Sequence, residues 1–250
     1  MINLDKTVDQ IVSWLQTQVK NAKVNGLVVG LSGGLDSAVV SYLIQRAFPD
    51  DSLAVIMPLR SNPNDIKHAE AVVQGSGIRS LTIDLSNSHQ TLYASIQDQL
   101  IEKNELVAET DRLADANLRA RLRMSTLYTI ATNYNYLVVG TDNASEWYTG
   151  YFTKYGDGGV DILPIVEFTK GEVREMARFL GVPNEIIEKK PSADLWEGQT
   201  DEEEMGTSYD KIDAFLKGEA IPEQDREIIE QMHQRSAHKR AIAKQFILPK

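Results

Sequence analysis

The sequence predicts an α/β fold in which a doubly wound parallel sheet is covered by helices on both faces. Short apolar runs, near residues 27–29, 53–57 and 136–140, have the length and composition of strands buried on both sides. Longer segments with apolar residues at helical spacing separate these runs. This alternation favours parallel pairing, because a crossover helix returns the chain to the same end of the sheet.

The first elements form a βαβ unit. A helix over about residues 4–22 precedes a strand at about 26–31, and a second helix continues to Pro49. A buried strand at 53–57 ends at Pro58, because proline lacks the N–H group that a continuing strand needs.

The later elements continue the same alternation. We expect a helix at 63–76, a strand at 79–84, helices at 88–103 and 109–134, and a strand at 136–140. A further strand is predicted at Ile162–Ile165, although Pro164 weighs against it because proline cannot donate to a β-ladder.

The last helix of this series, at 170–180, has clear ends. Thr169 and Glu172 have the spacing of a capping box, and Gly181 followed by Pro183 is typical of a helix terminus. Lys170 opposes the helix dipole in the first turn, so its position favours a bound phosphate over a solvated lysine.

Length and composition narrow the possible functions. The 250 residues suffice for one domain, predicted over 1–250, and 26 basic against 36 acidic residues argue against broad binding to nucleic acid or membranes. The absence of cysteine excludes disulfides, thiolate zinc sites and a glutamine-hydrolysing cysteine centre. With no signal peptide and no apolar run of about 20 residues, we expect a cytoplasmic protein with small-molecule partners.

A glycine- and serine-rich loop follows the first strand. Residues Gly30, Leu31, Ser32, Gly33, Gly34, Leu35, Asp36 and Ser37 stand between that strand and a helix. Amide groups at a helix N-terminus bind phosphate, and a carboxylate such as that of Asp36 is compatible with phosphate when a cation such as Mg²⁺ lies between them. The loop therefore indicates a nucleotide and a metal, and the alternative is a plain glycine-rich turn.

The same loop excludes two common nucleotide-binding motifs. It lacks the Gly-Lys-Ser/Thr ending of a Walker A loop and the spacing of a dinucleotide fingerprint. Its sequence instead resembles the loop of the ATP pyrophosphatases, which cleave ATP between the α and β phosphates.

Two later blocks contain further candidate ligands. Residues 117–124 carry three arginines on a helix, of which Arg121 shares a face with Asn117; solvated or ion-paired arginines are the alternative. Residues 140–146 follow a strand and place Thr141 and Glu146 near the carboxyl edge of the sheet. Asn143 and Glu146 could instead form only a capping box.

Two segments have the composition of loops that close over a ligand. Residues 150–159 contain four glycines, and Pro191–Thr207 is polar and acidic with little periodicity. Simple surface loops are the alternative. Closure would protect a reactive intermediate from water.

Taken together, these blocks resemble the bacterial NAD synthetases of the ammonia-dependent, single-domain type. The resemblance implies a Rossmann-like ATP pyrophosphatase fold, a homodimer, and the substrates ATP, ammonia and deamido-NAD, with Mg²⁺ as cofactor. The blocks that carry it are Gly30–Ser37, Asn117–Met124, Gly140–Glu146, Gly150–Asp161, Pro191–Gly206 and His238–Arg240.

The resemblance also implies roles for particular residues. Two departures from the family pattern, Leu35 for isoleucine and Ser192 for threonine, conserve apolar bulk and a hydroxyl group. The resemblance assigns Gly30–Ser37, Thr141, Lys170 and Ser192 to ATP, Asp36 and Glu146 to Mg²⁺, and Arg121, Lys154, Asp161, His238 and Lys239 to deamido-NAD.

The implied reaction is adenylation followed by amidation. A carboxylate needs a better leaving group before ammonia can displace it, and AMP supplies one. Asp36, Glu146 and Lys170 would act in catalysis, and Asp157 or Asp161 could help ammonium to lose its proton.

Three alternatives share the loop. A GMP synthetase ATPase domain or a tRNA-modifying adenylase would lack the later blocks. A regulatory nucleotide-binding module would not need both Asp36 and Glu146.

Overall fold

The computed structural model describes residues 3–59, 62–192 and 200–248. Its sheet contains the strands β1 (Gly26–Gly30), β2 (Ser52–Ile56), β3 (Arg79–Thr82) and β4 (Tyr136–Val139). The strands are parallel and lie in the order β3-β2-β1-β4. This architecture confirms the predicted α/β class with a parallel sheet.

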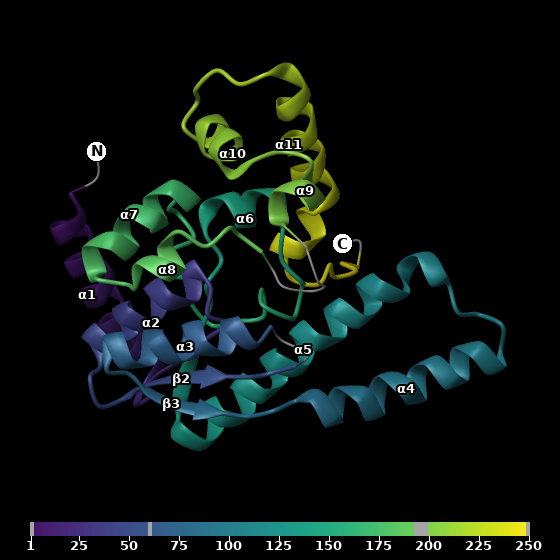
Figure 1. Cartoon of the computed structure of the whole chain (residues 1–250), viewed down its shortest axis with the longest axis horizontal. Coiled ribbons are helices and arrows are strands. Elements are labelled where there is room, and N and C mark those ends of the chain that lie inside the picture. The colour runs from purple at the N-terminus through teal and green to yellow at the C-terminus, as the bar shows by residue number, and fades with distance from the viewer. Residues whose placement is uncertain (1–2, 60–61, 193–199, 249–250) are drawn as a thin grey trace.

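Helices cover both faces of the sheet (Figure 1). Side chains alternate along β1, so Leu27 and Val29 pack with α1, α2 and α7 in one cluster, while Val28 packs with α5 in the other. The helices are α1 (Leu4–Ala22), α2 (Leu35–Ala47), α3 (Pro63–Ser76), α4 (Ser86–Glu102), α5 (Ala108–Tyr134), α6 (Ala144–Thr149), α7 (Lys170–Leu180), α8 (Asn184–Ile187), α9 (Asp201–Met205), α10 (Tyr209–Leu216), α11 (Glu223–Arg235) and the 3₁₀ helix η1 (Ala237–Arg240).

The strand order places a crevice at the carboxyl ends of β1 and β4. The chain runs from β1 outward through β2 to β3, and then returns to add β4 on the other side of β1. The loops after β1 and β4 therefore leave two neighbouring strands in opposite directions, and a crevice opens between them. Ligands bind in such a crevice in open α/β sheets.

The expected strand at Ile162–Ile165 is wrong. Only an isolated parallel bridge joins Ile162 to Val139, and the backbone then leaves the sheet. Pro164 has no N–H group with which to extend the ladder, so the pairing stops after one residue.

The expectation of loop throughout Pro191–Thr207 is also wrong, because α9 lies within it. The side chain of Thr200 caps α9 by accepting from the amide of Glu203, and Gly206 ends the helix at a φ of 73°. Acidic residues in the first turn stabilise α9 because they interact favourably with the helix dipole. The same acidic residues give the segment the polar composition of a loop. Residues 193–199 of this segment lie outside the described part of the chain.

Two substructures project from the central layers (Figure 1). Helices α9, α10 and α11 form a cap with an apolar cluster of its own, built around Met205, Tyr209, Ile212 and Ile229. Helix α4 and the beginning of α5 form a hairpin that extends sideways from the body, which we call the α4–α5 arm. Among the described helices, none has the length and apolar character needed to cross a membrane.

Candidate active site

A cavity of about 410 Å³ lies over the carboxyl ends of β1 and β4, within the size range of small-molecule sites. The residues that line it come from many parts of the chain, among them the loop after β1, the turn after β4, one side of α5, the glycine-rich segment at 150–160, the start of α7, and the cap. Of the predicted site residues, those at the cavity wall are Gly30, Leu31, Ser32, Gly34, Leu35, Asp36, Ser37, Thr141, Glu146, Lys170, Ser192 and Lys239.

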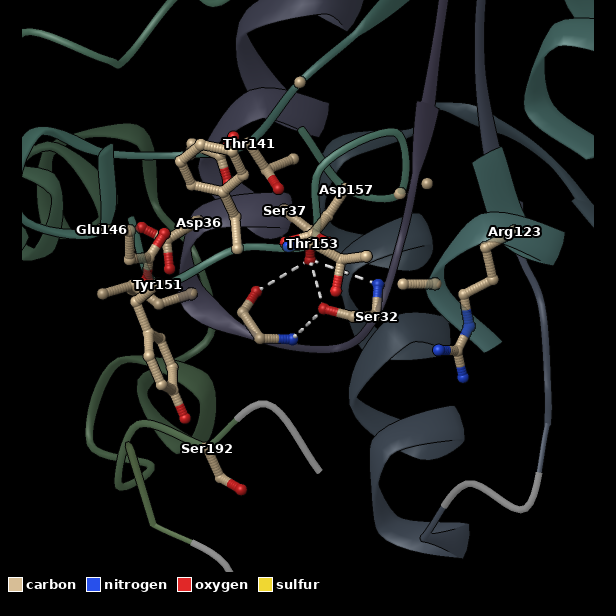
Figure 2. A pocket seen from close by; sticks show the side chains of 18 of the residues that line it. Ser32, Asp36, Ser37, Arg123, Thr141, Glu146, Tyr151, Thr153, Asp157 and Ser192 are labelled. Atoms are coloured by element: carbon tan, nitrogen blue, oxygen red, sulfur yellow. Dashed lines mark hydrogen bonds between the residues drawn. The ribbon is translucent and has the colours of Figure 1, made fainter. Parts of the chain in front are cut away.

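Hydrogen bonds within the loop after β1 hold it in one shape (Figure 2). The hydroxyl groups of Ser32 and Ser37 lie 3.0 Å apart, and that of Ser37 also donates to the carbonyl oxygen of Gly34 at 3.1 Å. The amide of Gly34 donates to Ser32 Oγ at 3.2 Å. The loop is therefore held in place by its own hydrogen bonds.

The loop leads into the N-terminus of α2, which differs from those of its neighbours. Helices α6 and α7 are capped by the side chains of Asn143 and Thr169, whereas Gly34 at the α2 N-cap provides no side-chain acceptor. The amide groups of the first turn have no intrahelical partner. At the wall of a cavity, they are suited to bind an anion such as phosphate.

Gly33→Ala is expected to destabilise the fold and raise the KM for ATP. Gly33 has a φ of +83°, and an added Cβ would lie 2.3 Å from the backbone oxygen of Asp65, so backbone must move. Gly77→Ala is the matched control, because Gly77 has a φ of +72° with nothing within 4 Å of its Cβ position. The control should lose only about 1–2 kcal/mol for its left-handed conformation. Thermal unfolding and ATP kinetics measure both variants; equal losses of stability with unchanged ATP KM would contradict the prediction.

Three charged side chains converge beside the loop. The ammonium group of Lys170 lies 2.5 Å from Asp36 Oδ2 and 3.0 Å from Glu146 Oε1. Asn143 Nδ2 also donates to Asp36 Oδ1 at 2.8 Å, and the hydroxyl group of Tyr209 donates to Glu146 Oε1 at 3.2 Å. Helices α2, α6 and α7 thus each contribute one charged residue to the cluster.

Local structure explains how α6 and α7 present these residues. Both begin with complete capping boxes: Thr169 with Glu172, as the sequence predicted, and Asn143 with Glu146, which the sequence left as an alternative. The carboxylate of Asp213 on α10 accepts from the amides of Lys170 and Gly171, at 3.3 and 2.7 Å, which ties the start of α7 to the cap. Glu146 therefore combines a capping role with a place in the charged cluster.

The environment of the cluster changes its titration. Burial raises the pKa of Glu146 to about 7, although Lys170 opposes the shift. Burial lowers the pKa of Lys170, but Asp36 and Glu146 outweigh that effect and raise it above its usual value. Lys170, only 4% exposed, is thus held as a buried cation between two carboxylates.

These carboxylates fit the donor chemistry of Mg²⁺. Oxygen atoms from Asp36 and Glu146 already converge on one cationic group, and Mg²⁺ prefers carboxylate, phosphate and water oxygen ligands. Among the described residues, no group of three or more histidine, aspartate or glutamate side chains is placed to hold a metal alone. A metal here would need nucleotide phosphates to complete its ligands, as is common for Mg²⁺.

The residues predicted for deamido-NAD differ in their position relative to the cavity. Lys239 donates to the carbonyl oxygens of Gly150 and Phe152, at 2.8 and 2.7 Å, and reaches the cavity wall. Arg121 donates to the carbonyl oxygen of Lys154, whose own ammonium group bonds to the carbonyl oxygen of His238. The structure brings these distant residues together, but Arg121, Lys154 and His238 do not line the cavity itself.

Asp161 and Gly33 also lie away from the cavity wall. Asp161 Oδ1 accepts from the hydroxyl group of Tyr128 at 3.0 Å, and Oδ2 accepts from the amide of Val138 at 2.8 Å. These bonds anchor the glycine-rich segment to β4. Asp157 lines the cavity, and its carboxylate accepts from the amide of Thr153 at 2.9 Å (Figure 2).

Several cavity residues were missed by the sequence analysis. Asp142 follows Thr141 directly after β4, a position that could have identified it. Arg123 lines the cavity although Arg121 was chosen from the same helix; its guanidinium donates to the carbonyl oxygen of Met57. For the other cationic and hydroxyl side chains of the wall, no local sequence pattern indicates a place at the cavity; they are Tyr151, Thr153, Arg174, Lys189 and Lys190.

Comparison with known proteins agrees with this geometry. Residues 7–243 match the family described as NAD synthase. The NH₃-dependent NAD⁺ synthetase of Alkaliphilus oremlandii is 58% identical over 240 residues, which cover 96% of each chain.

Solved structures give the same result. The NMN synthetase of Francisella tularensis has a TM-score of 0.92 at 38% identity, covering 99% of this chain and 100% of that one. The NH₃-dependent NAD synthetase of Campylobacter jejuni has a TM-score of 0.76 at 28% identity, again over 99% and 100% of the two chains. With its phosphate-type loop, its charged cluster and this similarity over nearly its full length, the chain belongs to the NAD synthase family.

Proposed function

We propose that the protein catalyses the ATP-dependent amidation of deamido-NAD by ammonia, which yields NAD⁺, AMP and pyrophosphate. The observation that carries the proposal is the shared cavity in which the loop after β1, with its free helix N-terminus, meets the Asp36–Lys170–Glu146 cluster. The names of the relatives support the same reaction. The absence of cysteine fits a chemistry that needs no thiol nucleophile or glutaminase centre.

In the first step the nicotinate carboxylate attacks the α phosphorus of ATP. An oxygen–phosphorus bond forms, the bond from the α phosphorus to the bridging oxygen breaks, and pyrophosphate leaves with that electron pair. The amides of the α2 N-terminus and the ammonium group of Lys170 stabilise the negative charge that develops on the phosphates. Mg²⁺ bound by Asp36 and Glu146 would supply further charge neutralisation at the phosphates.

In the second step ammonia attacks the carbonyl carbon of the acyl-adenylate. The new carbon–nitrogen bond replaces the carbon–oxygen bond to AMP, and the nitrogen gives up one proton. Because ammonium carries no lone pair, it must first lose a proton to become the nucleophile. Carboxylates at the cavity wall, among them that of Asp157, are available as acceptors.

Binding of deamido-NAD is proposed to involve Arg121, Lys154, Asp161, His238 and Lys239, of which Lys239 lines the cavity. The cationic groups of Arg121, Lys154 and Lys239 already donate to backbone carbonyl oxygens. A dinucleotide diphosphate would offer these cations stronger charged acceptors. ATP would occupy the loop after β1 with Thr141, Lys170 and Ser192.

Amidation of the mononucleotide is a second candidate, favoured by a specific similarity. The relative with a TM-score of 0.92 is described as an NMN synthetase. The chemistry at the nicotinate carboxyl is the same in both cases, and the two substrates differ in whether an adenylate half is present to be bound.

One assay separates these functions. Purified protein is incubated with ATP, Mg²⁺ and ammonium, together with either deamido-NAD or nicotinic acid mononucleotide, and the products are quantified. The proposal expects NAD⁺, AMP and pyrophosphate in equal amounts, with the higher kcat/KM for the dinucleotide. A higher kcat/KM for the mononucleotide would assign the second function, and release of ADP or no amide product would refute both.

We also propose a homodimer formed through the α4–α5 arm. Leu92 and Ile96, one turn apart on α4, are 43% and 41% exposed, and Ile101 and Val107 at the tip are more than half exposed. Such a group of exposed apolar side chains is typical of an interface. Leu92→Glu with Ile96→Glu should convert the dimer to monomer in size-exclusion chromatography with light scattering. Phe179→Glu, which replaces an exposed apolar residue on α7, should leave it intact; a monomeric wild type would contradict the proposal.

We also propose a domain organisation and a cellular location. Residues 1–250 form a single domain, consistent with a family match over 7–243. The protein acts in the cytoplasm, where its nucleotide substrates are found.

A further inference from the structure

Asp142 is a buried carboxylate without an apparent structural role. It lies in the turn after β4, is 3% exposed, and belongs to the cavity wall. Its Oδ2 atom is buried and has no hydrogen-bond partner within the described residues. Since an unpaired buried polar group is costly, its retention here requires an explanation.

The neighbouring residues have structural tasks that Asp142 does not share. Asn143 caps α6 and bonds to Asp36, and Glu146 completes the capping box. The buried cation of the same cavity wall, Lys170, is already held by two other carboxylates. None of these contacts supplies a positive charge to Asp142.

The surrounding charges make this position favourable for a cation. Burial raises the pKa of Asp142 well above its usual range, and the nearby carboxylates of Asp157, Glu146 and Asp36 raise it further. Negative potential from several acidic groups, focused at a low-dielectric wall, attracts small cations. The uncompensated oxygen would then gain both a counter-charge and a hydrogen-bond donor.

Among the components of the proposed reaction, ammonium has the matching chemistry. It carries one positive charge and four N–H donors with no acceptor, so it suits a wall of carboxylate oxygens. Asp157, which is exposed within the same cavity, offers a second carboxylate. Mg²⁺ suits this position less well, because it keeps several waters and prefers the phosphate side near Asp36 and Glu146.

We propose that Asp142 forms the buried wall of an ammonium site that holds the nitrogen donor beside the acyl-adenylate. This inference rests on the proposed amidation, because only that reaction brings ammonium to the cavity. Asp142 binds and positions the cation through its carboxylate group, whereas the adenylation step does not need it.

The test separates the two steps with Asp142→Asn, which keeps the side-chain shape and removes the charge. We expect the KM for ammonium to rise about ten- to a hundredfold, the loss typical of a charged hydrogen bond. The KM values for ATP and deamido-NAD, and the exchange of pyrophosphate into ATP that depends on deamido-NAD, should remain within twofold of wild type. Asp142→Ala serves as a second variant if the first does not fold.

A matched control removes a different buried carboxylate. Asp225→Asn breaks an ion pair with Lys211 outside the cavity and should leave the KM for ammonium unchanged. An unchanged ammonium KM in both Asp142 variants, or a loss of pyrophosphate exchange as large as the loss of amidation, would overturn the inference. Absence of exchange in the wild type would instead refute the proposed function itself.

Discussion

Lys170→Met is expected to lower kcat/KM by at least a thousandfold and to destabilise the fold. The substitution keeps the length and apolar part of the side chain but removes the cation between Asp36 and Glu146. The developing charge on the ATP phosphates then loses one stabilising group, and two mostly buried carboxylates face each other without compensation. Removing one partner of a buried ion pair costs about 3–5 kcal/mol.

Steady-state kinetics and thermal unfolding with and without Mg²⁺ measure both effects. Added Mg²⁺ should stabilise the Lys170→Met variant more than the wild type, because the cation would replace the missing counter-charge. Lys20→Met, at an exposed position near the end of α1, is the control and should change neither quantity appreciably. A folded Lys170→Met variant with more than a tenth of wild-type kcat/KM would disprove the role given to Lys170.

Asp36→Asn is expected to lower turnover by about a hundredfold to a thousandfold, equivalent to roughly 3–4 kcal/mol of transition-state stabilisation. The amide retains an oxygen that can accept from Asn143 Nδ2, so the local structure should persist. The substitution removes the negative charge next to Lys170. We propose that this same carboxylate of Asp36 also binds Mg²⁺. Stability should therefore fall much less than in Lys170→Met, since Glu146 still pairs with the lysine.

The dependence of rate on Mg²⁺ concentration tests this assignment directly. The variant should need a higher Mg²⁺ concentration for half-maximal rate, and the KM for ammonium should stay near that of the wild type. Asp9→Asn, an exposed position on α1, is the charge-matched control. An unchanged Mg²⁺ requirement with near-normal turnover would show that Asp36 is not a metal ligand.

Features set by local sequence could be predicted well. The alternation of strands and helices, the loop at Gly30–Ser37, and the capping boxes at Asn143 and Thr169 all depend on neighbours within a few residues. The errors arose where local signals compete. Pro164 allowed one bridge and then ended the ladder, and the acidic start of α9 resembled a polar loop.

The family resemblance supplied a second kind of prediction. It placed Asp36, Glu146 and Lys170 in one site although positions 36 and 170 are 134 residues apart in sequence. The composition and periodicity of the chain do not contain that proximity. It arises because parallel strands β1 and β4 bring the starts of α2 and α6 to the same edge of the sheet.

The fold class, the phosphate-type loop and the residue types available for catalysis could be inferred from the sequence alone, because these follow from short-range spacing and side-chain chemistry. Three features emerge only in the folded chain: Lys170 bridges two carboxylates, Arg123 rather than Arg121 reaches the cavity wall, and Asp142 is buried with its Oδ2 atom unpartnered among the described residues. Burial and long-range contacts depend on how α5, α7 and the cap pack over the sheet. Such packing is a property of the whole chain, which no local pattern records.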